Sequence, residues 1–231
     1  MFFQHSPALW RDFPELVPGL LFAEGISNDV SVDARAARFQ RAAEERLAGA
    51  SETEFPEIQA WRRAFSRMGL KPTQYRCASE SLLRRFKKER SLPSIHPLVD
   101  LCNAVSLAFA IPVAILDVAR LTGVIEVRYA SGSERYLSFS GETEHPAARE
   151  VVFADDAGQA HARRWTNRQS AYSAVRDSTD TVLIVAEAMH ASASADVNRL
   201  ITTIADEINA TWSISPRTAV LSQSSPRFAF S

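Results

Sequence analysis

Apolar residues recur every three or four positions in several stretches of the chain, which is the spacing of one face of a helix. Residues 55–68 show this most clearly, and Gly69 is placed to end that helix. Ser79 is a suitable cap for a short helix, and Pro97 stands where a first-turn proline is favoured. The helices predicted in this way cover 31–49, 55–68, a short segment from Ser79, 97–110 and 195–212.

Between residues 112 and 188 the pattern changes to short apolar runs such as PVAILDV, GVIEVRYA and TVLIVAEA. They are rich in β-branched and aromatic residues, and turn-forming segments such as GSE, SGE and DDAG separate them. Short connections favour antiparallel pairing. An opening strand is predicted within 15–26. Helices, then strands, then a helix indicate an α+β fold with a mainly antiparallel sheet flanked by helices.

The length of 231 residues is sufficient for one full hydrophobic core. We therefore predict a single domain over 1–231, with its core at about 60–212. The Ser- and Pro-rich segment 213–231 is predicted to be a tail that packs only in part.

Charge and cysteine content exclude several classes of protein. The chain has 26 Lys and Arg against 27 Asp and Glu, so an RNA contact requires a local basic patch. Cys77 and Cys102 do not form a disulfide framework or a zinc motif, and the five histidines stand singly, as surface or core histidines do. No metal or other cofactor is expected. The absence of a signal sequence and of an 18-residue apolar run predicts a cytoplasmic protein without a membrane partner.

A basic patch does occur in RRFKKER, and its cations are Arg84, Arg85, Lys87 and Lys88. Such a run suits contacts with the phosphates of an acceptor stem. An ordinary solvated helix face explains it equally well.

Polar residues interrupt the apolar helix 97–110 at every third position, as Asp100, Asn103 and Ser106. A buried polar side chain without a partner costs about 1–3 kcal/mol. This stripe therefore either bonds to the neighbouring backbone or lines a cavity.

The segment HARRWTNRQS combines three cations, two amides and an aromatic ring: Arg163, Arg164, Arg168, Asn167, Gln169 and Trp165. Arginine pairs with phosphate, tryptophan stacks on bases, and amides bond to polar edges, so the set suits the end of a nucleic acid. A salt-bridge cluster that supports the sheet is the alternative.

The phrases LVDLCNAVSL, IPVAILDVARLTGVIEVRYASGSE, EVVFADDAG and TDTVLIVAEA together resemble the B3/B4 domain of the phenylalanyl-tRNA synthetase β-subunit. YRCASESLLRRF and RRWTNRQS are more similar to its freestanding homologues, and the likeness covers about 60–190. In the synthetase this domain removes tyrosine from mischarged phenylalanine tRNA. The resemblance implies a B3/B4-like fold and hydrolysis, in trans and without a metal, of the ester of a mischarged tRNA. It implies tRNA as a partner, and an aminoacyl-tRNA synthetase as a further candidate.

The resemblance also implies roles for individual residues. Asn103 matches an asparagine that lines the family's editing pocket, and Ala114 stands where the synthetase has a histidine. Glu187 lies near the position of a glutamate that reads the tyrosine hydroxyl. A direct count places that glutamate at Val185, which shares a strand face with Glu187.

We expect the catalytic residues to orient the ribose and carbonyl and to stabilise charge, while the terminal adenosine hydroxyl assists the water. The catalytic candidates are Asn103, Asn167, Arg168 and Gln169, and the substrate-binding candidates are Ser106, Ala114, Arg164, Trp165 and Glu187. A non-catalytic module of the same fold that binds an amino acid, another small ligand or RNA is the alternative.

Overall fold

The computed structural model describes residues 1–230. The helices are α1 (Pro7–Asp12), α2 (Asp33–Gly49), α3 (Pro56–Arg67), α4 (Ala78–Glu89), α5 (Pro97–Phe109) and α6 (Ala193–Trp212), with 3₁₀ turns at Glu52–Glu54 and Val118–Arg120. The strands are β1 (Phe2–His5), β2 (Val17–Glu24), β3 (Val113–Asp117), β4 (Val124–Tyr129), β5 (Tyr136–Leu137), β6 (Thr143–Glu144), β7 (Val151–Ala154), β8 (Ala160–Arg163), β9 (Arg168–Gln169), β10 (Thr181–Ala188), β11 (Arg217–Val220) and β12 (Arg227–Ala229).

These strands form two main sheets and a small ribbon. The six-stranded sheet has the order β12-β1-β4-β7-β8-β9, the four-stranded sheet has the order β11-β2-β10-β3, and β5 pairs with β6. β1 runs parallel to β4, whereas the other strand pairs within residues 1–230 are antiparallel. The predicted α+β class and the mainly antiparallel pairing are confirmed.

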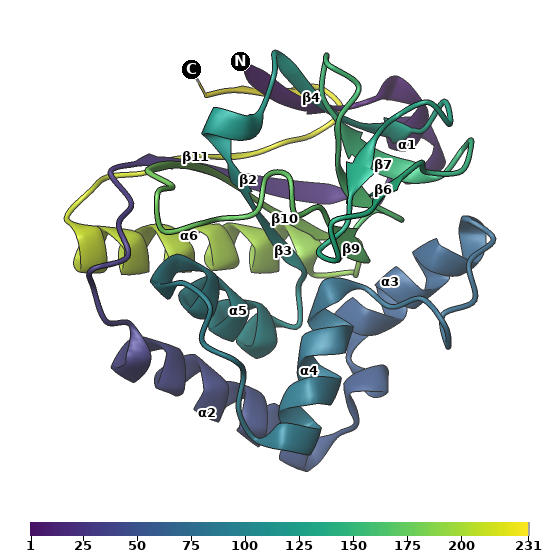
Figure 1. Cartoon of the computed structure of the whole chain (residues 1–231). Coiled ribbons are helices and arrows are strands. Elements are labelled where there is room, and N and C mark those ends of the chain that lie inside the picture. Colours follow the sequence, from purple (N-terminus) through teal and green to yellow (C-terminus); the bar gives the residue numbers. More distant parts are fainter. Residues whose placement is uncertain (231) are drawn as a thin grey trace.

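The four-stranded sheet lies in the middle of the molecule and is buried on both faces. Successive side chains of a strand point to opposite faces. Accordingly, Ile184 of β10 packs in one core cluster with residues of α2, α5 and α6. Its neighbours Leu183 and Val185 pack in a second cluster with residues of the six-stranded sheet, α1, α3 and α4. Figure 1 shows α6, α5 and α2 stacked on one side of the strands, away from the two chain ends.

Gly19 of β2 allows α6 to approach the sheet closely. A Cβ atom on Gly19 would lie 2.5 Å from Ile201 Cγ1 and 2.6 Å from Val197 Cγ1. Both neighbours are β-branched and stiff at χ1, so they have little freedom to move aside. A larger residue at this position would push the helix off the sheet.

The two ends of the chain differ from the sequence-based expectation. β1 and α1 were not predicted, and the segment expected to be a partly packed tail from residue 213 contributes β11 and β12. β11 extends the four-stranded sheet beside β2, and β12 pairs with β1, where the Phe230 N–H donates to the Met1 carbonyl. Phe230 is fully buried. This segment therefore contributes one edge strand to each of the two main sheets.

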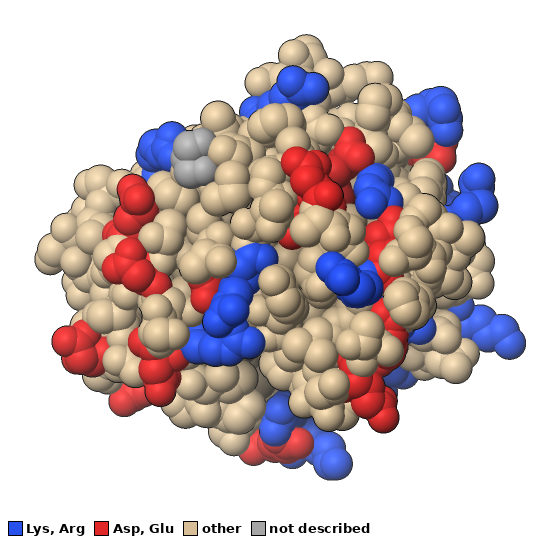
Figure 2. Space-filling view, turned by 45° about the horizontal axis from the view of Figure 1, so that its top comes forward, with Lys and Arg blue, Asp and Glu red and all other residues tan. Residues whose placement is uncertain are grey.

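The surface shown in Figure 2 carries basic and acidic side chains next to one another. This agrees with the net charge of −1. Within residues 1–230, no helix is both long enough and apolar enough to cross a membrane.

Candidate functional site

A cavity, here called the site cavity, lies where β3, β10 and the β8–β9 connection meet the start of α4. Its lining residues are Ala78, Pro112, Val113, Ala114, Phe153, Ala162, Trp165, Thr166, Asn167, Arg168, Gln169, Val185 and Glu187. Val185 and Glu187 both line it, as strand alternation predicts. The cavity therefore brings together six of the predicted site residues: Ala114, Trp165, Asn167, Arg168, Gln169 and Glu187.

The site cavity is narrow and has a buried floor. About 50 Å³ is open to the centres of water molecules. Since one water needs about 10–15 Å³ of such space, a few waters or a compact side chain fit. Phe153, Val185 and Glu187 are buried, while Ala114 is half-buried and Arg168 is exposed. The polar rim therefore marks the opening.

Glu187 is the one carboxylate that lines the site cavity, and it is only 1% exposed. Its Oε1 atom accepts a hydrogen bond from Trp165 Nε1 at 3.0 Å and lies 2.6 Å from His5 Nε2. Its backbone carbonyl accepts from Trp61 Nε1 at 3.2 Å. Oε2 has no hydrogen-bond partner among residues 1–230. The carboxylate thus keeps one oxygen available to a donor in the cavity.

His5 balances this buried carboxylate. An isolated buried charge is very costly, whereas a paired and hydrogen-bonded one is tolerated. Within residues 1–230, no lysine or arginine forms an ion pair with Glu187, but the His5 ring does, and it is 2% exposed. Phe3 and Trp10 contact the ring of His5 edge-on and hold its orientation.

The connection between β8 and β9 has a left-handed backbone. Arg164 has φ 45° and Trp165 has φ 59°, although neither residue is glycine. This conformation costs roughly 1–2 kcal/mol for each residue. The Arg164 N–H donates to Glu150 Oε1 at 3.0 Å, and the Trp165 N–H donates to the Val151 carbonyl at 2.8 Å, so both are held. The result is that Trp165 points inward to Glu187.

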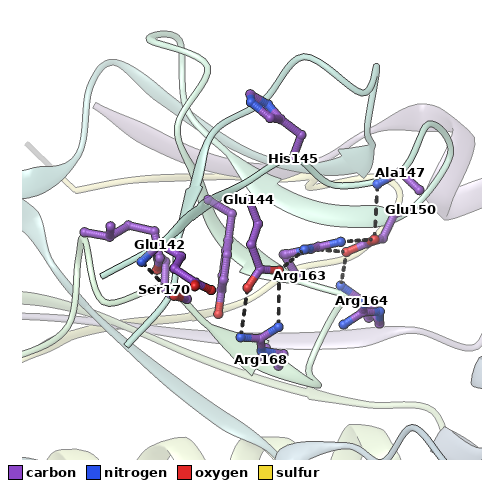
Figure 3. A network of polar contacts seen from close by, with 12 residues as sticks. Glu142, Glu144, His145, Ala147, Glu150, Arg163, Arg164, Arg168 and Ser170 are labelled. Carbon is purple, nitrogen blue, oxygen red and sulfur yellow. Dashed lines mark hydrogen bonds and ion pairs between the residues drawn. The ribbon is translucent and has the colours of Figure 1, made fainter. Parts of the chain in front are cut away.

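A salt-bridge network supports the outer side of this connection (Figure 3). Arg163 Nε and Nη2 donate to the two oxygens of Glu150 at 2.8 and 2.9 Å, and Arg163 Nη1 contacts Glu144. Arg168 donates two bonds of 3.3 Å to Glu144 and lies over the Tyr136 ring. Arg163 and Arg168 therefore belong to a salt-bridge cluster, and Arg168 also reaches the rim of the cavity. Contact of this segment with the end of a nucleic acid stays a prediction.

This network shifts the acidity of its members. Burial alone would raise the pKa of Glu150, but the hydrogen bonds and charge of Arg163 outweigh it and hold that pKa below its usual value. The bond to Glu150 raises the pKa of Arg163. The Glu150–Arg163 pair is therefore ionised at neutral pH.

The side-chain amides of Asn167 and Gln169, at the rim of the cavity, each donate a hydrogen bond to a backbone carbonyl. Asn167 Nδ2 donates to the Arg76 carbonyl at 2.7 Å, and Gln169 Nε2 donates to the Ile115 carbonyl at 2.5 Å. Their oxygens remain free to accept. The buried Oγ1 of Thr166, which also lines the cavity, has no hydrogen-bond partner among residues 1–230.

Three predicted residues lie outside the lining of the site cavity. Asn103 is half-buried on α5 and makes no hydrogen bond within residues 1–230, and the buried Ser106 donates to the Ile111 carbonyl at 2.6 Å. The guanidinium of Arg164 lies 4.9 Å from the centre of the Tyr75 ring. No residue of α5 therefore lines this cavity, although Asn103 and Ser106 were predicted to belong to the site. Ser106 follows the other interpretation of its stripe, a bond to the backbone.

Trp165 lines the cavity, but it does not present the exposed ring face that stacking on a base requires. Its side chain is fully buried and packs edge-on against Phe13 and Trp61. It positions Glu187 and leaves no exposed ring face for a nucleobase.

The basic run on α4 is partly neutralised. Arg84 and Lys87 pair with Glu52 at 3.1 and 3.3 Å, and Arg85 pairs with Glu89 at 2.8 Å. Lys88 is exposed and forms no ion pair with another residue of 1–230. Contact of this run with tRNA remains a prediction.

Sequence reasoning missed His5 and Thr166. His5 was grouped with lone histidines of the surface or core, and its partner Glu187 lies 182 positions later. Thr166 stood inside a segment that was already singled out, but nothing local showed that its hydroxyl would be buried. Residues 1–230 contain no cluster of His, Cys, Asp and Glu that could hold a metal ion.

Two curated proteins with similar sequences are both beta subunits of phenylalanine–tRNA ligase. The chain is 33% identical over 108 residues to the phenylalanine–tRNA ligase beta subunit of Shewanella oneidensis, covering 46% of this chain and 13% of that subunit. It is 41% identical over 64 residues to the same subunit of Aromatoleum aromaticum, covering 28% of this chain and 8% of the subunit. This chain therefore corresponds to a small part of either relative.

A solved structure gives a weaker likeness. An N-terminal fragment of the phenylalanyl-tRNA synthetase beta subunit from Pyrococcus horikoshii superposes with a TM-score of 0.48 and 10% identity, over 94% of this chain and 49% of that one. This level of likeness adds nothing to the assignment.

The family match is broader. Residues 60–207 match the B3/4 domain, and this range contains every residue that lines the site cavity but excludes His5. The resemblance inferred from the sequence is thereby confirmed. Since the match extends over more than half of the residues, the chain belongs to the B3/4 domain family, and it is related to the editing region of the phenylalanyl-tRNA synthetase β-subunit.

Proposed function

We propose that this protein is a trans-editing aminoacyl-tRNA deacylase, which hydrolyses the ester between a wrongly attached amino acid and its tRNA. The observation that carries the proposal is the free Oε2 of Glu187 inside a cavity with apolar walls. A buried acceptor of this kind selects a side chain that donates a hydrogen bond, because a substrate without the donor leaves the acceptor unpaired.

The reaction needs a positioned water and a stabilised oxyanion. Water adds to the ester carbonyl carbon, the bond from this carbon to the ribose oxygen breaks, and a proton from the water passes to that oxygen. In this proposal the hydroxyl of Thr166 donates to the carbonyl oxygen as negative charge develops, which is supported by its position in the cavity lining and by its lack of a partner among residues 1–230. A hydroxyl of the terminal ribose assists the water.

The rim residues receive more restricted roles than the sequence indicated. Asn167 and Gln169 each donate one amide N–H to a backbone carbonyl, so the amide oxygen accepts from a ribose hydroxyl and the second N–H stays a donor. Arg168 is exposed at the rim and can exchange its two long bonds to Glu144 for a phosphate. Asn103, Ser106 and Arg164 are not placed to touch a ligand inside this cavity.

One observation favours a second function, a module that binds an amino acid or another small ligand without hydrolysis. The lining residues include no histidine, serine or cysteine, and Ala114 occupies the position at which the resemblance implies a histidine. Thus Thr166 and Glu187 are the side chains of the lining that could act as nucleophile or general base, and no general base is bonded to the Thr166 hydroxyl, while Glu187 is engaged by Trp165 and His5.

A deacylation assay with matched pairs of esters tests the proposal. The substrates are tRNAs charged with serine or alanine, threonine or valine, and tyrosine or phenylalanine, each pair differing by a hydroxyl or by its replacement with a methyl group. We expect faster hydrolysis of the hydroxylated member of at least one pair. Glu187→Gln should reduce this preference by about 10²-fold or more, since a buried polar partner discriminates by up to 10⁴-fold.

Glu142→Gln is the matched control, because Glu142 is an exposed glutamate that does not line the cavity. It should leave the preference unchanged. If no ester is cleaved faster by the wild-type protein than in buffer, deacylation is refuted. Saturable binding of a free amino acid, lost in Glu187→Gln, would then establish the binding module.

The proposal includes a partner and a location. The partner is tRNA, with an aminoacyl-tRNA synthetase as a second one, in line with the relation to the synthetase subunit. We place the protein in the cytoplasm, where its two buried thiols, Cys77 and Cys102, would stay reduced.

A further inference from the structure

A second cavity, here called the terminal cavity, lies behind the His5–Glu187 pair. Its polar lining residues are Gln4, His5, Trp10, Gln223 and Arg227, which come from the two ends of the chain. His5 lines this cavity, Glu187 lines the site cavity, and their side chains are bonded to one another. The pair is therefore the partition between the two cavities.

Two buried nitrogen atoms of the terminal cavity have no partner. His5 Nδ1 and Trp10 Nε1 make no hydrogen bond within residues 1–230, although the two residues are 2% and 5% exposed. Buried polar groups in native proteins are nearly always satisfied, so an orphan indicates an unseen partner. The two rings lie only 5.4 Å apart, so one small molecule can reach both nitrogens.

The contact with Glu187 determines which ring nitrogen of His5 is available to the terminal cavity. Glu187 Oε1 accepts from Trp165, and no lysine or arginine within 1–230 pairs with the carboxylate. Because Nε2 of His5 is used by Glu187, Nδ1 is the ring nitrogen that remains for a ligand. The indole Nε1 of Trp10 is a donor, and Nδ1 of His5 is a donor whenever the ring carries both protons.

The other residues that line the terminal cavity include a positive charge and no negative one. Arg227 is exposed at the edge of the cavity, and its Nε donates to Gln4 Oε1 at 2.9 Å while the rest of the guanidinium has no ion pair with residues 1–230. No aspartate or glutamate lines the cavity. Glu126 accepts from Gln4 Nε2 at 2.7 Å but is not a lining residue. The lining thus combines the cation Arg227 with the unpartnered ring nitrogens of His5 and Trp10 and contains no acid.

We propose that the terminal cavity binds a compact oxyanion, a carboxylate or a phosphate, through His5 Nδ1, Trp10 Nε1 and Arg227. About 220 Å³ is open to the centres of water molecules, which is enough for such an ion and several waters. The site lies outside the residues that match the B3/4 family.

Binding there also acts on the site cavity. His5 contacts Glu187 Oε1 through its other ring nitrogen, and the same oxygen accepts from Trp165. An oxyanion on Nδ1 therefore acts on a chain of hydrogen-bonded groups that ends at the site cavity. Any such coupling between two sites is reciprocal.

The test is a titration followed by the indole N–H signals of the ¹⁵N-labelled full chain. The four tryptophans give four signals, and single Trp→Phe substitutions assign them. Sodium acetate and sodium phosphate are added in separate series at constant ionic strength, with sodium chloride as the reference. We expect a saturable shift of the Trp10 signal with at least one oxyanion, and a shift of Trp165 with the same midpoint, because Trp165 donates to Glu187.

Trp212 is the internal control, since its Nε1 donates to the Ser27 carbonyl, away from both cavities. Its signal should not move. Trp10→Phe should weaken the affinity read at Trp165 by about tenfold or more, because a bond to a charged group is lost. Arg227→Gln, at an exposed position, should fold normally and weaken it by about two- to fivefold.

Each outcome has one meaning. Saturation with acetate alone identifies a carboxylate site, and saturation with phosphate alone identifies a phosphate site. Linear or absent shifts of Trp10 in both series mean that the cavity holds only water, and the proposal fails. A Trp10 shift without a Trp165 shift refutes the coupling. The titration uses no tRNA, so its failure leaves the deacylation proposal untouched, and the reverse also holds.

Discussion

The site cavity and the terminal cavity share one wall but differ in origin and chemistry. The site cavity is the narrower, with an acid at its floor, and lies wholly within residues 60–207. The terminal cavity is wider, contains donors and no acid, and is built from residues before 60 and after 207. Glu187 lines one cavity and its hydrogen-bond partner His5, whose Nδ1 has no partner among residues 1–230, lines the other. The family fold thus supplies the carboxylate, and the N-terminal segment supplies its histidine partner.

The largest effect should follow from breaking the shared wall. Glu187→Leu leaves the buried ring nitrogens of His5 and Trp165 without their partner, and removing one member of a buried pair costs about 3–5 kcal/mol. The double variant His5→Leu, Glu187→Leu should recover part of this loss, because the buried imidazole is removed as well. Urea denaturation measures all three free energies of unfolding.

Glu142→Leu, at an exposed position, should change stability by less than about 0.5 kcal/mol. Additive effects of the two single substitutions would contradict the pair, since residues in contact show an interaction energy.

A substitution that fills only the site cavity tests whether the two cavities function independently. Ala114→Phe places a ring at the half-buried rim and should reduce ester hydrolysis, or ligand affinity, at least about tenfold. The response of Trp10 to oxyanions should persist in this variant, because Ala114 does not line the terminal cavity. Ala210→Phe, on the exposed surface of α6, is the control and should alter neither measurement. Simultaneous loss of both responses would show that the cavities are not separate.

Acid should weaken the Glu150–Arg163 pair, which supports the outer side of the β8–β9 connection. Because the pKa of Glu150 is depressed in the folded protein, its contribution to stability is complete above the unfolded value of about 4.3 and is lost as the pH falls through the folded value. The free energy of unfolding should therefore decline below about pH 5. Glu150→Gln should lower stability at pH 7 and flatten this decline, measured by urea denaturation between pH 7 and pH 3. An unchanged pH profile would mean that the Glu150–Arg163 pair does not contribute.

The smallest effect concerns tRNA contacts outside both cavities. Lys88→Gln together with Arg90→Gln should reduce the slope of log affinity against log salt by about 1–2, since each lost phosphate contact contributes about 0.7–0.9. Arg84→Gln with Lys87→Gln should change it less, because Glu52 already binds these two side chains. Equal slopes in all variants would remove the α4 patch from the proposed tRNA surface.

The sequence predicted those parts of the molecule that depend on local periodicity. α3 ends at Arg67, next to the predicted stop, and β10 coincides with the apolar run TVLIVAEA. α5 was correctly predicted as buried, but its polar stripe was ambiguous, since spacing does not show whether a side chain such as Ser106 faces the backbone or a cavity.

The remaining features depend on contacts between distant residues. β1 is four residues long and is stabilised by β4 and β12, so its own sequence carries little signal. The two left-handed residues of the turn, Arg164 and Trp165, are neither glycine nor asparagine, so nothing at these positions indicates this backbone. Trp165 was therefore expected to stack on a base and is found in the core beside Glu187.

The pairing of β1 with β12 has a consequence for biosynthesis. β1 leaves the ribosome among the first segments, yet Gln4 meets its partner Arg227 only 223 positions later. Until then one edge of the first strand stays open, and long-range closures of this kind slow folding. The order of translation is thus the reverse of the order in which this sheet can be completed, and the nascent protein depends on its last strand to seal its first.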